Sequence, residues 1–166
     1  LDKKINLGLD LQGGSYLLLE IDNSPVIDQK FQNLTITIKN YFKEKNIRIN
    51  NLKLLDKKLL FSADEKFKQI ILDEFNDEES NLNPYYPRFK MHQLNIAEEN
   101  NFFTLTFSKQ GIVEIKTSSQ DQALEIVRRR IDEIGTNEPN ILKRGNDRIL
   151  VELPGLDDPM RIKSLL

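Results

Sequence analysis

The sequence predicts an α+β fold in which an antiparallel sheet is covered on one face by helices. Short apolar runs rich in strand-forming residues occur in pairs separated by polar turns. Longer stretches between them repeat their apolar residues every three or four positions, which is typical of helices. The chain has 166 residues, of which 39% are hydrophobic and 30% charged, so we expect a folded chain with a buried core.

The first predicted strand, residues 15–22 (SYLLLEID), is followed directly by a helix. Ser24 is a suitable N-cap and Pro25 a suitable first helical residue. Residues 35–38 (TITI) alternate as a strand would, but the apolar residues around them keep helical spacing, so we expect the helix to continue to about Lys45. These apolar positions are Ile27, Phe31, Leu34, Ile38, Tyr41 and Phe42.

Residues 47–63 predict two short strands that turn near Asp56 and Lys57. A second helix follows, with Asp64 or Ser62 as its cap. Its predicted apolar face consists of Phe67, Ile70, Ile71 and Phe75.

Residues 89–96 and 102–107 predict a second hairpin across the turn EENN. The first 107 residues therefore give the order β-α-β-β-α-β with one further strand. This is the order of the ferredoxin-like fold, an antiparallel sheet with two helices on one face.

A long helix is predicted from Gly111 to Gly135, with Ser108 as its cap. Because VEIKTSS contains poor helix formers, a later start at Ser118 is the alternative. Two further strands are predicted over residues 140–144 and 148–153.

We expect four parts along the chain. They are a glycine-rich loop over residues 1–14, a ferredoxin-like subdomain over 15–107, the long helix with its strand hairpin over 108–157, and the start of a further helix over 158–166. Because the chain begins at Leu1 without Met and stops within a helix-like pattern, we expect it to be a piece of a longer polypeptide.

Composition excludes several classes of function. The net charge of −2 removes the usual electrostatic argument for a nucleic-acid partner. Cysteine is absent, which excludes disulfides and thiolate metal ligands. No apolar stretch approaches the roughly 18–20 residues that span a bilayer.

The segment LGLDLQGG, residues 7–14, raises the question of a phosphate site. A dinucleotide-binding glycine loop follows a strand and opens a helix, whereas this segment precedes a strand. We therefore expect Gly13 and Gly14 to adopt positive φ angles or to permit the close approach of another backbone segment.

No catalytic residue, metal site or cofactor site is predicted. His92 is the only histidine, and zinc needs three or four ligands. The acidic run over residues 73–80 lacks the spacing of a calcium loop and is expected to be a solvated surface.

The basic run at residues 128–130 lies in the long predicted helix. Consecutive helical residues point about 100° apart, so Arg128 and Arg129 are expected to face solvent and Arg130 to lie near the apolar stripe. Arg130 is then a candidate anchor between helix and sheet, and complementing the helix dipole is the alternative role of the run.

Three segments together resemble the SecD family of protein-export membrane subunits, in its first extracytoplasmic region. They are LGLDLQGG with the strand after it, VRRRIDEIGTNEPNI, and GNDRILVELPGLDDPMRIKSLL. The residues that carry the resemblance, with a hinge or structural role implied, are Gly8, Asp10, Gly13, Gly14, Arg128, Arg130, Gly135, Glu138, Pro139, Asp147, Arg148, Glu152, Leu153, Pro154 and Gly155.

The resemblance implies a ferredoxin-like, non-catalytic base domain on the periplasmic side of the inner membrane, without a cofactor. The full-length parent would be anchored in the membrane and would work with SecF, the SecYEG channel and YajC. It would use the proton-motive force in late steps of the export of an unfolded polypeptide. The glycine segment would then be the joint between membrane and domain.

Three other functions remain open at this point. A ferredoxin-like RNA-binding module would use aromatic residues on one strand face, and Phe103 and Phe107 are candidates. A small-molecule sensor would need a pocket with convergent polar groups. An enzyme would need a nucleophile–base pair or a metal set, and the sequence shows neither.

Overall fold

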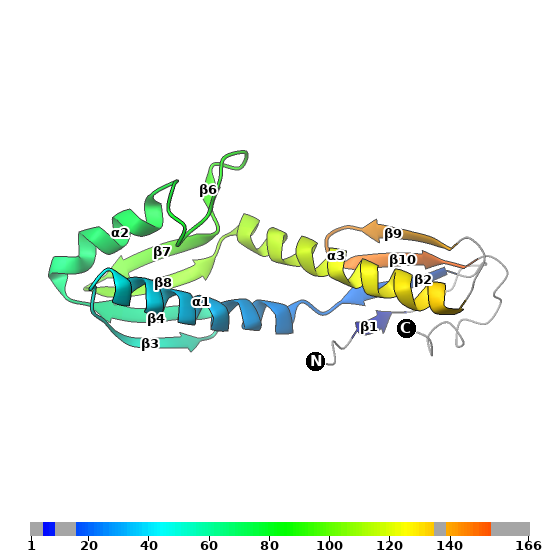
Figure 1. Cartoon of the computed structure of the whole chain (residues 1–166), viewed down its shortest axis with the longest axis horizontal. Coiled ribbons are helices and arrows are strands. Elements are labelled where there is room, and N and C mark those ends of the chain that lie inside the picture. The colour runs from blue at the N-terminus through cyan, green and yellow to red at the C-terminus, as the bar shows by residue number, and fades with distance from the viewer. Residues whose placement is uncertain (1–4, 9–15, 135–138, 154–166) are drawn as a thin grey trace. The chain divides into compact units, whose positions relative to one another are not determined.

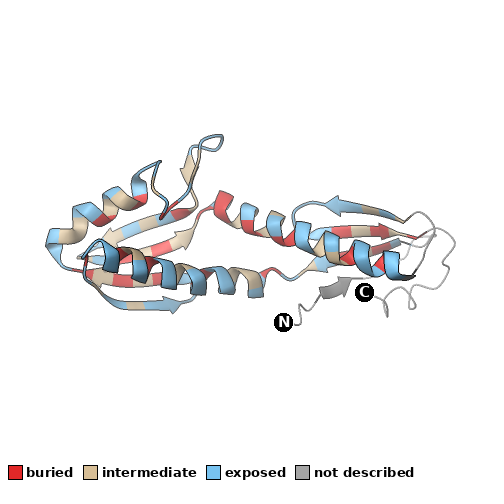
Figure 2. Ribbon diagram, in the orientation of Figure 1, coloured by how far each residue is buried: buried red, intermediate tan, exposed pale blue. Residues whose placement is uncertain are grey.

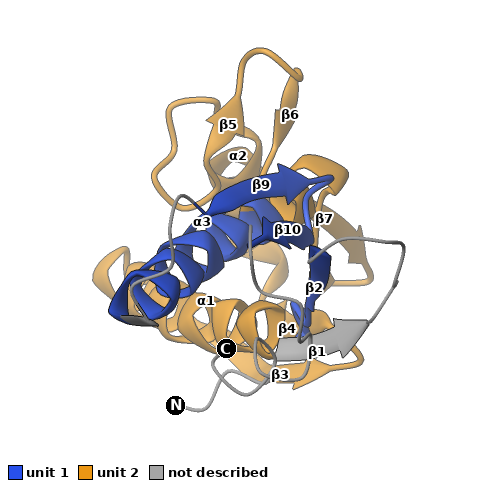
Figure 3. Ribbon diagram, turned by 90° about the vertical axis from the view of Figure 1, so that its right-hand side faces the viewer, with its two compact units in different colours: residues 1–24, 115–166 blue, residues 25–114 orange. Residues whose placement is uncertain are grey.

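A computed structural model describes residues 5–8, 16–134 and 139–153, with the backbone alone for residues 5–8 and Ile134. Helices and antiparallel strands alternate along the chain, which confirms the predicted α+β class (Figure 1). The chain forms two compact units (Figure 3). Unit 1 comprises residues 1–24 and 115–166, and unit 2 comprises residues 25–114.

Each unit has its own four-stranded antiparallel sheet. The sheet of unit 1 has the order β1-β2-β10-β9, with β1 at Ile5–Gly8, β2 at Tyr16–Ile21, β9 at Asn140–Arg144 and β10 at Arg148–Glu152. The sheet of unit 2 has the order β3-β4-β8-β7, with β3 at Ile49–Leu55, β4 at Lys58–Ala63, β7 at Leu94–Glu99 and β8 at Phe102–Phe107.

The single ferredoxin-like sheet predicted for the first 107 residues is therefore wrong. Strand β2 pairs with β1 and β10, and makes no pairing with the strands of unit 2. The local sequence of a leucine-rich strand is compatible with either sheet. Which sheet the strand joins depends on a partner strand near the other end of the chain. The loop predicted for residues 1–14 is also corrected, because residues 5–8 form β1.

Unit 2 packs both of its α-helices against one face of its sheet. Helix α1 spans Ser24–Glu44 and α2 spans Lys68–Asn76. Their buried residues join those of β4, β7 and β8 in one core, which includes Phe31, Ile38, Phe42, Phe61, Ile71, Phe75 and Phe103. Buried and half-buried residues alternate along most of β4 and β8, as Figure 2 shows. One face of this sheet thus forms the core.

Several local predictions in unit 2 are confirmed. The TITI stretch is helical, and the Thr35 hydroxyl donates to the carbonyl of Phe31. Asp56 and Lys57 both have positive φ, of 48° and 58°, which suits a two-residue hairpin turn. Asn100 and Asn101 form the matching turn between β7 and β8.

Other boundaries in unit 2 differ from the prediction. Asp64 precedes a 3₁₀ turn, η1 (Glu65–Phe67), and its side chain makes no capping hydrogen bond. The strand predicted over residues 89–96 is divided. Its first part, β6 (Met91–His92), pairs with β5 (Tyr85–Tyr86), and β7 begins after Gln93, whose N–H donates to the carbonyl of Pro84.

Helix α3, Lys109–Ile134, begins in unit 2 and continues in unit 1. The Ser108 hydroxyl accepts a hydrogen bond of 3.0 Å from the N–H of Gly111, which confirms Ser108 as the cap and excludes the later start at Ser118. In unit 1, Val127 and Ile131 of α3 pack on β2 and β10. The core residues of these strands are Leu17, Leu19, Ile149 and Val151, and Leu153 joins them just after β10.

Among the described residues, no helix is both long enough and apolar enough to cross a membrane.

Candidate functional site

One end of the unit 1 sheet collects the segments that carry the motif residues. Tyr16 at the start of β2 lies opposite Glu152 at the end of β10, and Glu152 lies opposite Asn140 at the start of β9. Gly8, at the end of β1, pairs with Leu18 near the same end. We call this the motif end. The chain continues from it into the segments 9–15, 135–139 and 154–155, which hold most of the motif residues.

A row of interacting side chains lies across three strands at the motif end. The side chain of Tyr16 hydrogen-bonds to the Glu152 carboxylate, which also accepts a bond of 2.8 Å from Asn140 Nδ2. The hydrogen bond from Tyr16 lowers the pKa of Glu152, and the same bond raises the pKa of Tyr16. This row, Tyr16–Glu152–Asn140, joins three neighbouring strands across their side chains, and we call it the clamp row.

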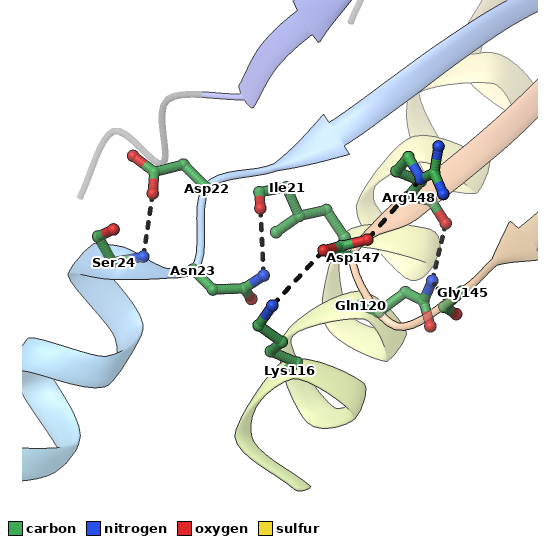
Figure 4. Close-up of polar contacts among 9 residues, drawn as sticks. All are labelled: Ile21, Asp22, Asn23, Ser24, Lys116, Gln120, Gly145, Asp147 and Arg148. Carbon is green, nitrogen blue, oxygen red and sulfur yellow. Dashed lines mark hydrogen bonds and ion pairs between the residues drawn. The ribbon is translucent and has the colours of Figure 1, made fainter. Parts of the chain in front are cut away.

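The opposite end of the sheet is tied to α3 by a buried amide (Figure 4). Gln120 is 2% exposed, and its Nε2 donates to the carbonyls of Gly145 at 3.1 Å and Arg148 at 2.7 Å. The first carbonyl belongs to the β9–β10 turn, where Gly145 has a φ of +59°, and the second to the first residue of β10. The amide thus connects α3 to the turn and to the start of β10 through two backbone acceptors.

An ion pair and backbone contacts complete this second cluster. Lys116 Nζ lies 3.5 Å from Asp147 Oδ2, and the N–H of Ile21 donates to the carbonyl of Asp147 at 2.7 Å. Asn23, two residues after the end of β2, donates from Nδ2 to the carbonyl of Ile21. Figure 4 shows that these groups come from β2, α3 and the β9–β10 turn, so the cluster holds three separate segments together.

Comparison with known proteins finds two matching family models. The model described as "SecD/SecF GG Motif" matches residues 1–25. The model described as "Protein translocase subunit SecDF, P1 domain, N-terminal" matches residues 120–166. SecD of Rickettsia bellii (strain RML369-C) is 33% identical over 98% of this chain, and SecD of Acetobacter pasteurianus (strain NBRC 105184 / IFO 3283-01) is 33% identical over 99%. The chain belongs to the SecD family.

The chain spans 29% of the Rickettsia bellii SecD and 31% of the Acetobacter pasteurianus SecD. No solved structure was found to match it. Both SecD family matches fall almost wholly within unit 1, because residues 1–24 and 115–166 make up that unit. Two segments that are far apart in the sequence, and that SecD family models match separately, thus form one sheet.

Some SecD motif residues can be placed in the structure. Gly8 ends β1, and Leu153, directly after β10, is buried in the core of unit 1. Arg148 begins β10 and its carbonyl accepts from Gln120. Pro139 is half-buried just before β9. The motif residues outside the described ranges are Asp10, Gly13, Gly14, Gly135, Glu138, Pro154 and Gly155.

The position predicted for Arg130 is corrected. Arg128, Arg129 and Arg130 are all exposed, and none makes a hydrogen bond or ion pair with another described residue. The stripe of α3 that faces the sheet runs through Val127 and Ile131. Arg130 therefore does not lie between helix and sheet, and its part in the SecD motif stays a prediction.

The aromatic residues considered for RNA stacking belong to the core of unit 2 or pack against it. Phe103 is 1% exposed and stacks on Phe61 with ring centroids 4.9 Å apart. Phe107 packs on Phe31 at 4.5 Å. His92 is half-buried, with Nδ1 2.9 Å from the carbonyl oxygen of Asn83. Among the described residues, no group of histidine and carboxylate side chains could hold a metal ion.

Unit 2 has an open groove beside α1 and α2, whose polar groups already pair with one another. The Tyr41 hydroxyl donates to Glu74, and Lys45 Nζ lies 3.1 Å from the same carboxylate. The hydrogen bond from Tyr41 is the largest influence on the pKa of Glu74, which is lowered. Burial and the bond to Glu74 raise the pKa of Tyr41.

Sequence reasoning missed Tyr16, Asn140 and Gln120. Nothing in the local pattern marks Tyr16 or Asn140, because strand ends often carry polar or aromatic residues. One sequence feature could have drawn attention to Gln120, because it is a polar residue in the middle of a helix that has an apolar stripe.

Proposed function

We propose that this chain is a non-catalytic domain of a SecD-type protein-export subunit and acts as a mechanical link. In this proposal it lies on the periplasmic side of the inner membrane. It transmits movements of membrane helices, driven by the proton-motive force, to a late step in the export of an unfolded polypeptide. Its proposed partners are SecF, the SecYEG channel, YajC and the exported chain. The family matches support a place in the Sec translocase, and the finer role is our inference.

The arrangement of the motif end carries this proposal. Motif segments from three parts of the sequence join one end of one sheet. A displacement applied to any of these segments reaches β1, β2, β9 or β10 directly. A link of this kind needs attachment points that share one rigid body, and the motif end provides them.

The remainder of unit 1 has the features of a rigid body. Its core residues Leu17, Leu19, Ile149 and Val151 are at most 1% exposed. The clamp row joins the strands at one end, and Gln120 joins the turn to α3 at the other. Close-packed interiors transmit displacement because they resist compression.

Gly13 and Gly14 are proposed to form the joint between this body and the membrane-embedded part of the protein. Glycine adopts backbone angles that other residues resist, at a cost of roughly 0.5–1 kcal/mol in conformational entropy relative to Ala. A β-branched side chain would remove that freedom. We therefore expect a β-branched substitution at this joint to impair transport while leaving the folding of the chain largely unchanged.

The test replaces Gly14 by Val in the full-length subunit, in cells depleted of their own SecD. We expect export of a secreted reporter to fall by about tenfold, while the melting temperature of the 166-residue chain changes by less than about 2 °C. Gln12→Val, in the same segment, is the matched control and should leave export near normal. Collapsing the proton gradient should lower export by the wild-type protein to the level measured for the Gly14→Val variant.

Normal export with Gly14→Val would refute the joint. Site-specific crosslinks from the domain to an exported polypeptide, with and without a proton gradient, test the wider role. Crosslinks whose positions do not depend on the gradient would refute transmission of movement. A measured catalytic turnover in the purified chain would refute the non-catalytic role.

A further inference from the structure

The face of the unit 1 sheet that points away from α3 carries a continuous apolar row. Leu18 of β2, Leu150 of β10 and Leu142 of β9 lie opposite one another in register. The alternating burial of β2 and β10 sends Leu17, Leu19, Ile149 and Val151 to the core with α3, and so these three leucines to the other face. Leu142 is 42% exposed. We call this surface the open face and its apolar centre the leucine row.

A charged row lies on the open face beside the leucine row. Glu20, Arg148 and Arg144 are opposite one another in register, two residues along the strands from the leucines. The carboxylate nearest to Arg148 is that of its neighbour Asp147, 3.8 Å from Nε, and Arg144 has no ion pair with any described residue. Like charges directly opposite each other destabilise a sheet. The two guanidinium groups thus present a site for acceptors from outside the unit.

The clamp row lies on the other side of the leucine row, and its chemistry complements the charged row. Glu152 accepts hydrogen bonds from Tyr16 and Asn140, but a carboxylate has about four acceptor positions, so it can also accept from an arginine. Along the strands, the three rows therefore follow one another as acceptor-rich, apolar and charged, and the charged row holds two arginines beside Glu20.

We propose that the open face binds the open face of a second copy of this chain, about a two-fold axis that runs along the leucine row. Each leucine then packs on its equivalent in the other copy. Arg148 faces Glu152 of the other copy, and Arg144 faces Asn140. The axis repeats each contact, as in an isologous dimer. This inference goes beyond the proposed transport function and does not depend on it.

The two-fold axis could run along the leucine row or parallel to the strands, and the two orientations bring different charged residues together. A two-fold axis parallel to the strands would also bring leucines together. When that axis runs along β10, however, it places Arg148 on Arg148 and Glu152 on Glu152, because both residues lie on this strand. Like charges brought together at an interface cost several kcal/mol. The axis along the leucine row brings Arg148 to Glu152 and packs each leucine on its own equivalent, whereas a strand-parallel axis between β2 and β10 would pack Leu18 on Leu150.

The expected association is weak. The three rows contribute far fewer side chains than the 20–30 residues per partner of a standard interface. Interfaces at this lower end of the size range are transient. The test must therefore use high protein concentration or trap the complex covalently.

Crosslinking tests the geometry directly, because the chain contains no cysteine and any introduced thiol is unique. Packed sheets lie about 10 Å apart, so a bismaleimide linker of similar length should join Leu150→Cys to itself. Phe102→Cys, at a 63% exposed site on unit 2, is the control and should not crosslink.

Mixed variants test the orientation. From the strand rise and the sheet separation, Arg148 and Glu152 of the other copy should be about 10 Å apart, and the two Arg148 positions about 17 Å apart. A mixture of Arg148→Cys and Glu152→Cys chains should thus crosslink at least about fivefold more than Arg148→Cys alone. The reverse ranking would overturn the proposed axis.

Sedimentation equilibrium with charge-reversed variants tests the contacts. Arg148→Glu and Glu152→Arg should each weaken self-association by at least about tenfold, and the double variant should recover it to within about threefold. Leu142→Lys, at an exposed site that tolerates substitution in the monomer, should also abolish it. A chain that stays monomeric up to about 1 mM would overturn the proposal, as would a correctly folded double variant that does not recover association.

Discussion

Replacing Gly111 by Ala tests how closely the start of α3 is held against the rest of unit 2. A Cβ at this position would lie 2.3 Å from the carbonyl oxygen of Gln93 and 3.2 Å from its carbon. Real Cβ contacts essentially never fall below 3.0 Å, so the helix start or the Gln93 peptide must move by about 0.7 Å. That peptide oxygen also accepts from the N–H of Ser108, at 2.9 Å.

The magnitude follows from three terms. Overpacking costs roughly 1–3 kcal/mol, and weakening the bond from Ser108 to Gln93 costs about 1 kcal/mol more. Alanine regains about 1 kcal/mol in helix propensity over Gly. The net loss is about 2 kcal/mol in the free energy of unfolding, which corresponds to a fall of about 4–8 °C in the melting temperature for a chain of this size.

The assay is thermal and urea unfolding of the 166-residue chain, followed by circular dichroism. Ser118→Ala, at an exposed position in the same helix, is the matched control and should be neutral or slightly stabilising. An unchanged or higher melting temperature for Gly111→Ala would refute the reasoning, since it would mean that the close approach to Gln93 is relaxed at no cost.

Three further predictions concern single side chains. Gln120→Ala removes a donor from the carbonyls of Gly145 and Arg148 and should lower the free energy of unfolding by roughly 2–4 kcal/mol in urea, whereas Glu125→Ala, at an exposed position of the same helix, should cost less than about 0.5 kcal/mol. The pKa of Glu74 is lowered in the folded state, so its contribution is present above its unfolded pKa near 4.5 and is lost as pH falls through the lower folded pKa. Tyr41→Phe removes the largest cause of that shift, so the variant should lose less stability than wild type between pH 6 and about 3 in a pH series of unfolding curves. Arg130→Ala should leave the melting temperature within about 1 °C, because Arg130 is exposed and has no hydrogen bond or ion pair with the described residues, and a large fall would restore the anchoring role.

Local signals predicted most elements of both units. Ser108 capped α3 as expected, since a cap depends only on residues three positions apart. The turn at Asp56 and Lys57 and the turn that contains Gly145 also formed where predicted. The helical spacing of Phe31, Ile38 and Phe42 outweighed the local TITI alternation, because all three are buried in the core of unit 2.

The candidate site was predicted only in part. The motif segments were identified from the sequence, but their meeting at one end of a single sheet was not. Tyr16 and Asn140 became recognisable only when the register placed both beside Glu152. Gln120 became recognisable only when its two carbonyl partners, Gly145 and Arg148, were known. Side chains that act through distant backbone groups leave little trace in local sequence patterns.

The sequence by itself determined the α+β class, the helices with their caps, the hairpin turns and the likeness to SecD. These features depend on residues a few positions apart, where spacing and turn chemistry are sufficient. Tertiary structure alone decided that β2 joins β10 rather than the strands of unit 2. A leucine-rich strand can pair with any partner that offers backbone groups and an apolar face. The register with β10 and the packing of α3 on the core face decide which sheet β2 joins. Both involve residues that lie more than a hundred positions after β2 in the sequence.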